Sequence, residues 1–173
     1  MTIDFEPRPG RSRDGAPFTI RAIRPEDFAL EDDFIRSLSE ESRYLRLMYA
    51  LREPPASFVE RMVNVDGETT MALVAVTQSA GKERFIAMSR YGRYPDGRGA
   101  EFGIAVADAW QRRGIATQLM QALVDYAKSH GVERFEGEVL STNERMLDLC
   151  RWLKFDIRRS PESPQIVIAS KRL

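Results

Sequence analysis

The sequence contains very few of the residues on which several common kinds of site depend. Its 173 residues include a single cysteine, Cys150, and a single histidine, His130. One cysteine excludes an internal disulfide framework and a cysteine-rich metal site, and it is compatible with a reducing compartment. One histidine makes a histidine-based zinc site or a Ser-His-Asp triad very hard to build. We therefore expect no metal in this protein.

The sequence also lacks a net charge and long apolar runs. The 26 Lys and Arg residues balance the 26 Asp and Glu residues, which argues against a nucleic-acid partner held by bulk electrostatics. No apolar run approaches the ~20 residues of a membrane span, and the first residues lack the apolar stretch of a signal peptide. These features predict a soluble, cytoplasmic enzyme or binding domain with no nucleic-acid or membrane partner. Its chemistry must depend on carboxylates, backbone amides or a bound cofactor.

Residues 1–17 are rich in proline, glycine and arginine. A segment of this composition buries too little apolar surface to offset the entropy that is lost when a chain becomes ordered. We therefore predict a flexible tail over residues 1–17. The remaining residues, 18–173, fall within the ~100–200 residues that are typical of a single domain.

Hydrophobic periodicity predicts both helices and strands after residue 17. Leu30, Phe34 and Leu38 recur every four residues, as on one face of a helix, whereas residues 71–76 form a short apolar run that is typical of a buried strand. Helices are expected at 25–38, 39–51, 58–63, 114–130 and 143–153, and strands at 18–24, 71–76, 85–91, 100–106, 135–140, 155–159 and 165–170. This order of elements predicts one mixed α/β layer structure.

The most informative stretch runs from Glu101 to Thr117, where a strand leads into a tight turn that opens a helix. The backbone N–H groups from about Arg112 to Thr117 lie at the positive end of the helix dipole, an arrangement that suits a pyrophosphate. Gly114 lets the backbone approach an anion without an intervening Cβ atom, and Ala116 keeps another position small. The stretch is neither a Walker A loop nor a dinucleotide fingerprint. In isolation, so short a match favours a surface turn whose arginines face water, and the preceding strand changes that interpretation.

Side chains alternate across the strand that precedes this turn. Glu101, Gly103 and Ala105 share one of its two faces. A face made of one carboxylate and two small residues is a poor core surface and a good floor for a ligand. Gly103 also indicates a bulge or a close backbone approach, as in a strand that pairs with a substrate. Together the strand and the turn predict an extended groove with an anion-binding helix start at one end and a carboxylate at the other.

The turn resembles the Gln/Arg-x-x-Gly-x-Gly/Ala motif with which the GNAT superfamily of N-acetyltransferases binds the pyrophosphate of acetyl-CoA. The matching residues are Gln111, Gly114 and Ala116, and the similarity extends over the whole chain beyond the predicted tail. More narrowly, residues 39–46 and 100–102 resemble the acetyltransferase modules of bacterial protein lysine acetyltransferases. The resemblance implies a GNAT-like fold, with a single mixed, mostly antiparallel central sheet flanked by helices.

The resemblance also implies an activity, the transfer of an acetyl group from acetyl-CoA to a primary amine by direct attack in a ternary complex. It makes Glu101 the general base. Its chemistry supports this role, because a lysine ammonium has a pKa of about 10.4 and must lose a proton before its nitrogen attacks. A carboxylate in a narrow, partly apolar groove has a raised pKa, which suits the task. The alternative for Glu101 is an ordinary solvent-facing strand residue. The residues expected to bind the cofactor are Ile104, Ala105, Val106, Gln111, Arg112, Arg113, Gly114, Ile115, Ala116, Thr117 and Asn143.

Two residues late in the chain bear on the same reaction. Asn143 begins a predicted helix, where it is expected to cap the first turn; by resemblance it also hydrogen-bonds the pantetheine arm or a substrate. Many relatives place a tyrosine, acting as general acid toward the leaving thiolate, seven residues later, where this chain has Cys150. We interpret Cys150 as a small buried apolar residue. A thiolate whose pKa is about 8.5 can also leave with a proton from water.

The sequence leaves the acceptor open. A protein lysine is the first expectation, and a small-molecule amine is the alternative. A non-catalytic acyl-CoA-binding regulatory module and an unrelated phosphate-binding protein are further alternatives. A homodimer is common in such folds, but no sequence pattern establishes one here.

Overall fold

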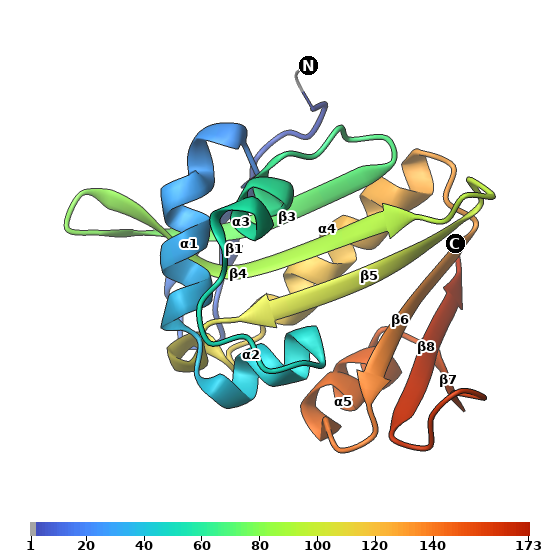
Figure 1. Cartoon of the computed structure of the whole chain (residues 1–173). Coiled ribbons are helices and arrows are strands. Elements are labelled where there is room, and N and C mark those ends of the chain that lie inside the picture. Colours follow the sequence, from blue (N-terminus) through green and yellow to red (C-terminus); the bar gives the residue numbers. More distant parts are fainter. Residues whose placement is uncertain (1–2) are drawn as a thin grey trace.

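The computed structural model describes residues 3–173 and contains one eight-stranded sheet with the strand order β1-β2-β3-β4-β5-β6-β8-β7 (Figure 1). Every neighbouring pair is antiparallel except β5 and β6, which are parallel. This arrangement confirms the α/β fold class and the mixed, mostly antiparallel sheet. The strands are β1 (Arg8–Arg11), β2 (Pro17–Ala22), β3 (Thr70–Ser79), β4 (Lys82–Arg93), β5 (Gly99–Val106), β6 (Arg134–Leu140), β7 (Asp156–Arg159) and β8 (Ile166–Arg172).

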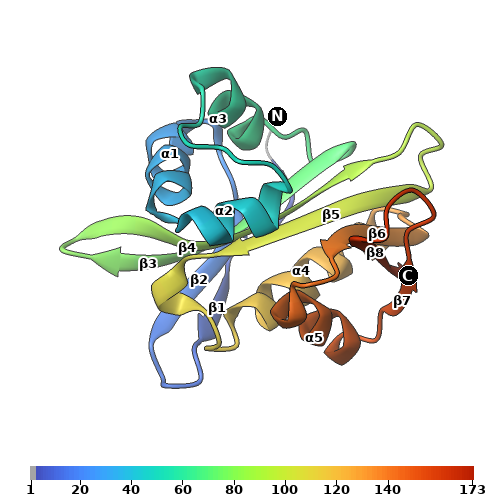
Figure 2. The same ribbon diagram turned by 60° about the horizontal axis from the view of Figure 1, so that its bottom comes forward.

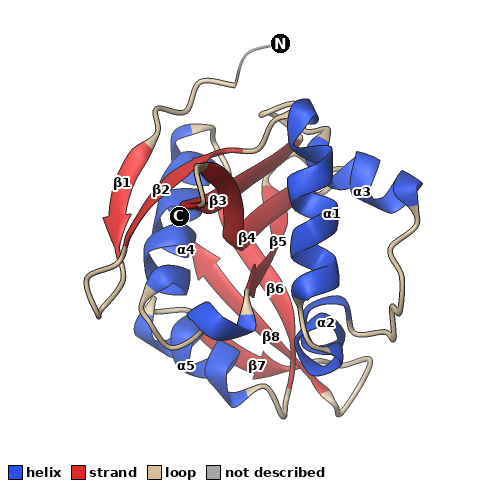
Figure 3. Ribbon diagram, turned by 90° about the vertical axis from the view of Figure 1, so that its left-hand side faces the viewer, coloured by secondary structure: helices blue, strands red, loops and turns tan. Residues whose placement is uncertain are grey.

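Helices cover both faces of the sheet. The α-helices are α1 (Phe28–Ser37), α2 (Glu40–Leu47), α3 (Ala56–Val63), α4 (Ile115–Ser129) and α5 (Glu144–Trp152), and two short 3-10 helices span Pro25–Asp27 and Asp108–Trp110. Figure 3 shows α1 and α3 on one side of the sheet, with α4 and α5 on the other. Within residues 3–173, no helix combines the length and the hydrophobicity that crossing a membrane would require.

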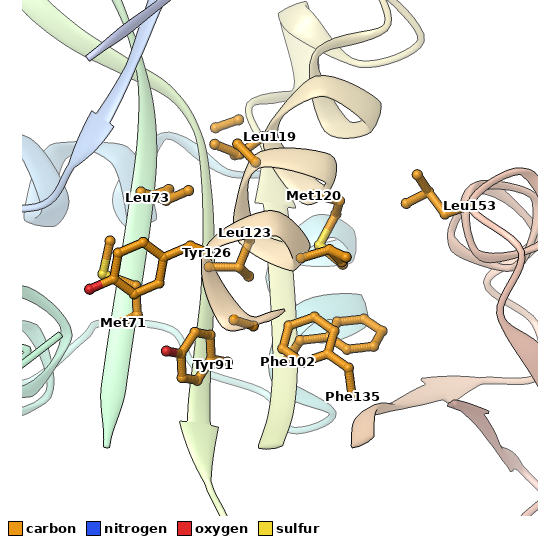
Figure 4. Packing of buried hydrophobic residues seen from close by; sticks show 14 of the residues in the cluster. Met71, Leu73, Tyr91, Phe102, Leu119, Met120, Leu123, Tyr126, Phe135 and Leu153 are labelled. Atoms are coloured by element: carbon orange, nitrogen blue, oxygen red, sulfur yellow. The ribbon is translucent and has the colours of Figure 1, made fainter. Parts of the chain in front are cut away.

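Alternation along β3 explains why the sheet has a core on each face. Met71, Leu73 and Ala75 belong to the core beneath α4, whereas the intervening Ala72 and Val74 belong to the core beneath α1 and α3. All of these side chains are fully buried. A strand that is covered on both faces loses the polar alternation of a half-exposed strand, which is why its sequence is one continuous apolar run. Figure 4 shows the first of the two cores, with Leu119, Leu123 and Tyr126 of α4 beside β3.

The parallel strands β5 and β6 pair over a short distance only. Their register runs from Gly99 opposite Arg134 to Glu101 opposite Glu136, and beyond this point the two strands separate (Figure 1). An aromatic cluster lies where they part. The ring of Phe102 stacks on Phe135 with centroids 5.1 Å apart and meets Phe155 edge-on at 5.2 Å. The separation opens the sheet in its middle.

The prediction of a flexible tail over residues 1–17 is wrong for most of that segment. Residues 8–11 form β1, which pairs with β2 from Arg8 opposite Ile20 to Arg11 opposite Pro17. Before β1, Ile3 and Phe5 pack against the core. Composition suggested a tail because the segment has few apolar residues, but backbone pairing at a sheet edge requires none. Residues 1–2 lie outside the described part of the chain.

Other elements differ from expectation only at their ends. The helix predicted to open at Pro25 begins as a 3-10 turn and becomes α-helical at Phe28. Ser39 caps α2 as its side chain accepts a hydrogen bond from the N–H of Ser42. Helix α4 ends before Gly131, which has a positive φ of 78°; glycine adopts this conformation without steric cost.

Candidate active site

A groove of about 1000 Å³ lies where β5 and β6 separate. Its walls come from β5, from the start of α4, from α5 with the end of β6, and from α2. Figure 2 shows α2 on one side of β5, with α4 and α5 on the other. The groove therefore joins segments that are far apart in the sequence. All of the predicted site residues line it except Arg113.

The free edge of β5 presents backbone groups to the groove. The N–H of Ala107 donates to the carbonyl of Ile86 in β4 at 2.9 Å. Because hydrogen-bonding directions alternate along an antiparallel strand, the amide of Ala105 also faces β4, whereas those of Ile104 and Val106 face the opened edge. The carbonyl of Val106 confirms this direction, since it accepts a hydrogen bond at 3.1 Å from a side chain of the groove rather than from β4. Of the three residues expected on this strand, two can offer their amides to a ligand.

The start of α4 is formed by two residues in the left-handed region. Arg112 has a φ of 61° and Gly114 a φ of 80°. The following amides, from Ile115 to Thr117, have no carbonyl partner within the helix because they belong to its first turn. The side chain of Ile115 is fully buried, so only its backbone is available to a ligand. This geometry suits an anion, since the amides converge at the positive end of the helix dipole.

Gln111 holds the turn in place. Its Nε2 donates to the carbonyl of Val106 at 3.1 Å and to Ser42 Oγ at 3.0 Å, and its Oε1 accepts from Arg145. Asp108 adds two more links, accepting from the hydroxyls of Ser39 and Ser42 at 2.8 Å each. The side chain of Gln111 is therefore engaged by β5, α2 and α5.

The two arginines of the motif point in different directions. Arg112 lines the groove. Arg113 turns away from it, donating to the carboxylate of Asp14 at 2.6 and 3.0 Å and lying 4.0 Å from the ring centroid of Trp110. Hydrogen bonds from Arg113 and Ser12 lower the pKa of Asp14 to about 2. The sequence-based grouping of Arg113 with the cofactor ligands assumed that both arginines face the same side, and the structure separates them.

Glu101 stands at the point where β5 and β6 part. Its side chain lines the groove and is exposed to solvent. Partial burial raises the pKa of Glu101 above its usual range, and the nearby carboxylate of Glu138 raises it further, while Arg46 opposes both effects. A carboxylate with a raised pKa that faces an open groove is suited to accepting a proton from a ligand.

Arg46 of α2 is a groove residue that the sequence did not indicate. Its guanidinium lies against Gly103, so close that a Cβ atom at that position would overlap it. The glycine in the strand was interpreted as a bulge or as the place where a substrate backbone approaches. The structure shows instead that Gly103 makes room for Arg46. Burial and the neighbouring Arg90 lower the pKa of Arg46 to about 10.

Asn143 and Cys150 occupy the positions that the sequence suggested for them. Asn143 caps α5, its Oδ1 accepting from the N–H of Met146 at 3.2 Å, and it also lines the groove. Cys150 is 1% exposed and belongs to the core beneath α4 and α5. Burial raises the pKa of its thiol to about 11.

The position of Cys150 predicts an unreactive thiol. Because thiolate is the reacting form, a pKa about two units above the ordinary value leaves roughly 100-fold less of it at pH 8. We expect 5,5′-dithiobis(2-nitrobenzoic acid) to label the native protein at least about 100-fold more slowly than the protein unfolded in guanidinium chloride. Labelling of the native protein at the unfolded rate would contradict the buried position.

The described residues, 3–173, contain no group of three or more His, Cys, Asp or Glu side chains placed to hold a metal ion.

The opened sheet and its groove define the class of the protein, an acyltransferase built on the GNAT fold. Residues 27–155 match the model of the acetyltransferase (GNAT) family, and the chain belongs to this family. The expected fold and enzyme class are thereby confirmed.

Individual relatives support the same assignment. The chain is 30% identical to "Acetyltransferase PA5475" of Pseudomonas aeruginosa over 90% of its length and 83% of that protein. It is 32% identical to "Acetyltransferase Pat" of Mycolicibacterium smegmatis over 81% of its length, but spans only 41% of that longer protein. Among solved structures, the GNAT domain of S. lividans PAT superposes with a TM-score of 0.87 at 27% identity, over 96% of this chain and 97% of the other.

Proposed function

We propose that this protein is an acetyl-CoA-dependent N-acetyltransferase that acetylates a primary amine, with a protein lysine as the acceptor. The observation that carries the proposal is the single groove that runs from the start of α4, along the free edge of β5, to Glu101. Val106 follows Glu101 by five steps along the extended strand, a distance of about 17 Å. An extended thioester arm can follow that edge, with its anionic end at the helix and its reactive end near the carboxylate.

In the proposed reaction the backbone binds the donor. The amides from Ile115 to Thr117 bind the pyrophosphate, and Gly114 adopts the left-handed φ of 80° that precedes them. The amides of Ile104 and Val106 hydrogen-bond the pantetheine arm, and an amide on the same edge polarises the thioester carbonyl. Asn143 adds a side-chain contact from the opposite wall.

Glu101 then removes a proton from the acceptor ammonium, directly or through water. The free nitrogen attacks the thioester carbon and forms a C–N bond. The C–S bond then breaks as the thiolate of CoA departs, and the attacking nitrogen releases its second proton to solvent water. The thiolate takes a proton from water, because the thiol of Cys150 is buried and has a raised pKa. The products are an acetylated amine and CoA, without an acyl-enzyme intermediate.

The resemblance of residues 39–46 and 100–102 to bacterial protein lysine acetyltransferases supports a lysine acceptor. Glu101 and Glu138 both line the groove, and their negative charge complements a lysine ammonium. We place the reaction in the cytoplasm, in keeping with the single cysteine of the chain.

The experiment that tests the proposal combines binding with turnover. We expect isothermal titration calorimetry to show acetyl-CoA binding, and thiol release to appear with lysine-containing proteins in a panel that also holds small amines. Release with small amines alone would move the acceptor to a metabolite. Binding without release for any acceptor would favour a non-catalytic acyl-CoA-binding module. If a simple nucleotide displaced acetyl-CoA as effectively as CoA does, the protein would be an unrelated phosphate-binding protein.

The electrostatics of Glu101 predict opposite pH shifts for two variants. Activity requires the ionised carboxylate, so the acidic limb of kcat/KM follows the pKa of Glu101. Glu138 raises that pKa and Arg46 lowers it. We therefore expect the limb to move to lower pH in Glu138→Gln and to higher pH in Arg46→Gln, with thermal unfolding confirming that each variant is folded. A limb that stays in place in both folded variants would show that another group limits the rate.

A further inference from the structure

The turn between β1 and β2 lies against the start of α4. Figure 3 shows the β1–β2 hairpin running along this helix. The N–H of Arg13 donates to the carbonyl of Arg113 at 2.9 Å, and the side chain of Gln118 donates to the carbonyl of Arg11 at 2.8 Å. The ion pair between Asp14 and Arg113 is a third link. The segment that sequence composition suggested was a tail is thus attached to the proposed pyrophosphate site.

The turn itself is internally bonded. Ser12 is 4% exposed, its N–H donates to the carbonyl of Ala16 at 2.9 Å, and its Oγ accepts from the N–H of Ala16 at 3.0 Å. Its hydroxyl also donates to Asp14 at 2.5 Å. Gly15, with a φ of 89°, supplies the left-handed residue that closes the turn. The backbone of Arg13 is therefore held by hydrogen bonds on both sides.

The side chain of Arg13 extends along Gly114. Its Cγ and Nε lie 3.4 and 3.5 Å from the position that a Cβ atom would take on Gly114, and the residue lines the groove. Its guanidinium forms no ion pair with any residue in the described range 3–173. Arg113, by contrast, is neutralised by Asp14. The β1–β2 hairpin therefore has two effects at the start of α4. Its Asp14 holds Arg113 away from the groove, and its Arg13 places a different cation beside Gly114.

We propose that Arg13 is a cofactor-binding residue whose guanidinium pairs with the 5′-diphosphate of acetyl-CoA. This inference rests on the proposed function. The diphosphate is the expected partner because the first amides of α4 converge beside Gly114, which is where Arg13 lies. A guanidinium adds charge-assisted hydrogen bonds to those of the backbone. The affinity of this enzyme for CoA thioesters then depends on a hairpin that precedes the region matched by the family model.

Titration of acetyl-CoA into Arg13→Ala tests the proposal. Loss of one charge-assisted contact is expected to weaken binding about tenfold, and KM for acetyl-CoA should rise accordingly. Arg11→Ala is the matched control, because Arg11 is also exposed and on the same hairpin but does not line the groove. It removes the same charge and should leave affinity unchanged.

Titration of 3′-dephospho-CoA distinguishes the two kinds of phosphate on the cofactor. If Arg13→Ala binds both CoA and 3′-dephospho-CoA about tenfold more weakly than the wild type does, the diphosphate assignment is supported. If the variant loses affinity for CoA only, the assignment is overturned in favour of the 3′-phosphate. Equal affinities of wild type and Arg13→Ala for acetyl-CoA, or equal losses in Arg13→Ala and Arg11→Ala, would also overturn it. If the wild type itself binds no acetyl-CoA, the proposed function fails first, so the two failures are distinguishable.

Discussion

Replacing Glu101 with glutamine is expected to lower kcat by about 10²- to 10⁴-fold, the usual contribution of a general base. The amide keeps the size and the hydrogen-bonding capacity of the side chain but cannot accept a proton from the ammonium. Because Glu101 lies at the opposite end of the groove from the start of α4, the affinity for acetyl-CoA should stay close to that of the wild type. Steady-state kinetics and calorimetric titration measure the two quantities separately.

The pH dependence of the variant supplies a second readout. Without a base, the reaction draws on the small fraction of acceptor that is already unprotonated, so the rate should rise about tenfold per pH unit up to the pKa of the acceptor. Glu136→Gln is the matched control. Glu136 lies opposite Glu101 in the parallel register and pairs with Arg134 and Arg158, but it does not line the groove. If Glu101→Gln retains wild-type turnover, Glu101 is not the base.

Truncating Phe102 to alanine is expected to reduce the free energy of unfolding by about 3–5 kcal/mol, the range found for large buried aromatic residues. Phe102 is 6% exposed and contacts Phe135 and Phe155 within the aromatic cluster. It also covers Gly137 so closely that a Cβ atom there would lie 2.6 Å from the ring. The decrease in the free energy of unfolding should therefore be large for a single core substitution.

Urea denaturation followed by circular dichroism measures this change. Trp152→Ala is a suitable comparison, because Trp152 is equally aromatic but 65% exposed, and its loss should change the unfolding free energy by no more than about 0.5 kcal/mol. Phe102→Leu should fall between the two, since it restores most of the volume. A loss below about 1 kcal/mol for Phe102→Ala would mean that the aromatic cluster does not stabilise the point where β5 and β6 part.

Most of the predictions that the structure confirmed concern helices, strands and turns, which depend on residues close together in the sequence. Leu30 and Phe34 indicated a helix through their spacing, and the apolar run of residues 71–76 indicated a buried strand. The strand-turn-helix around Gly114 predicted a helix start with free amides, and the structure has one. Such features are decided by backbone propensity and by side-chain spacing over a few residues, so one chain is enough to reveal them.

Predictions from composition and local sequence were wrong where contacts between distant segments decide the structure. Residues 8–11 have little apolar content, yet they form a strand because β2 offers them an unpaired edge. Arg113 looked like a ligand for the cofactor until Asp14, 99 residues earlier, was found to hold it. Gly103 indicated a close approach, but only the fold shows that Arg46 is the group that approaches.

The sequence by itself therefore determined the class of the protein, the strand that carries Glu101 and the turn that opens α4. The tertiary structure alone decided which side chains share the groove. It placed Arg46 and Arg13 in the groove and Arg113 outside it. By parting β5 from β6, it also left the amides of Ile104 and Val106 without a partner strand. The physical reason is that these contacts join segments separated by tens of residues. Their closeness follows from strand order and register, which local propensity does not specify.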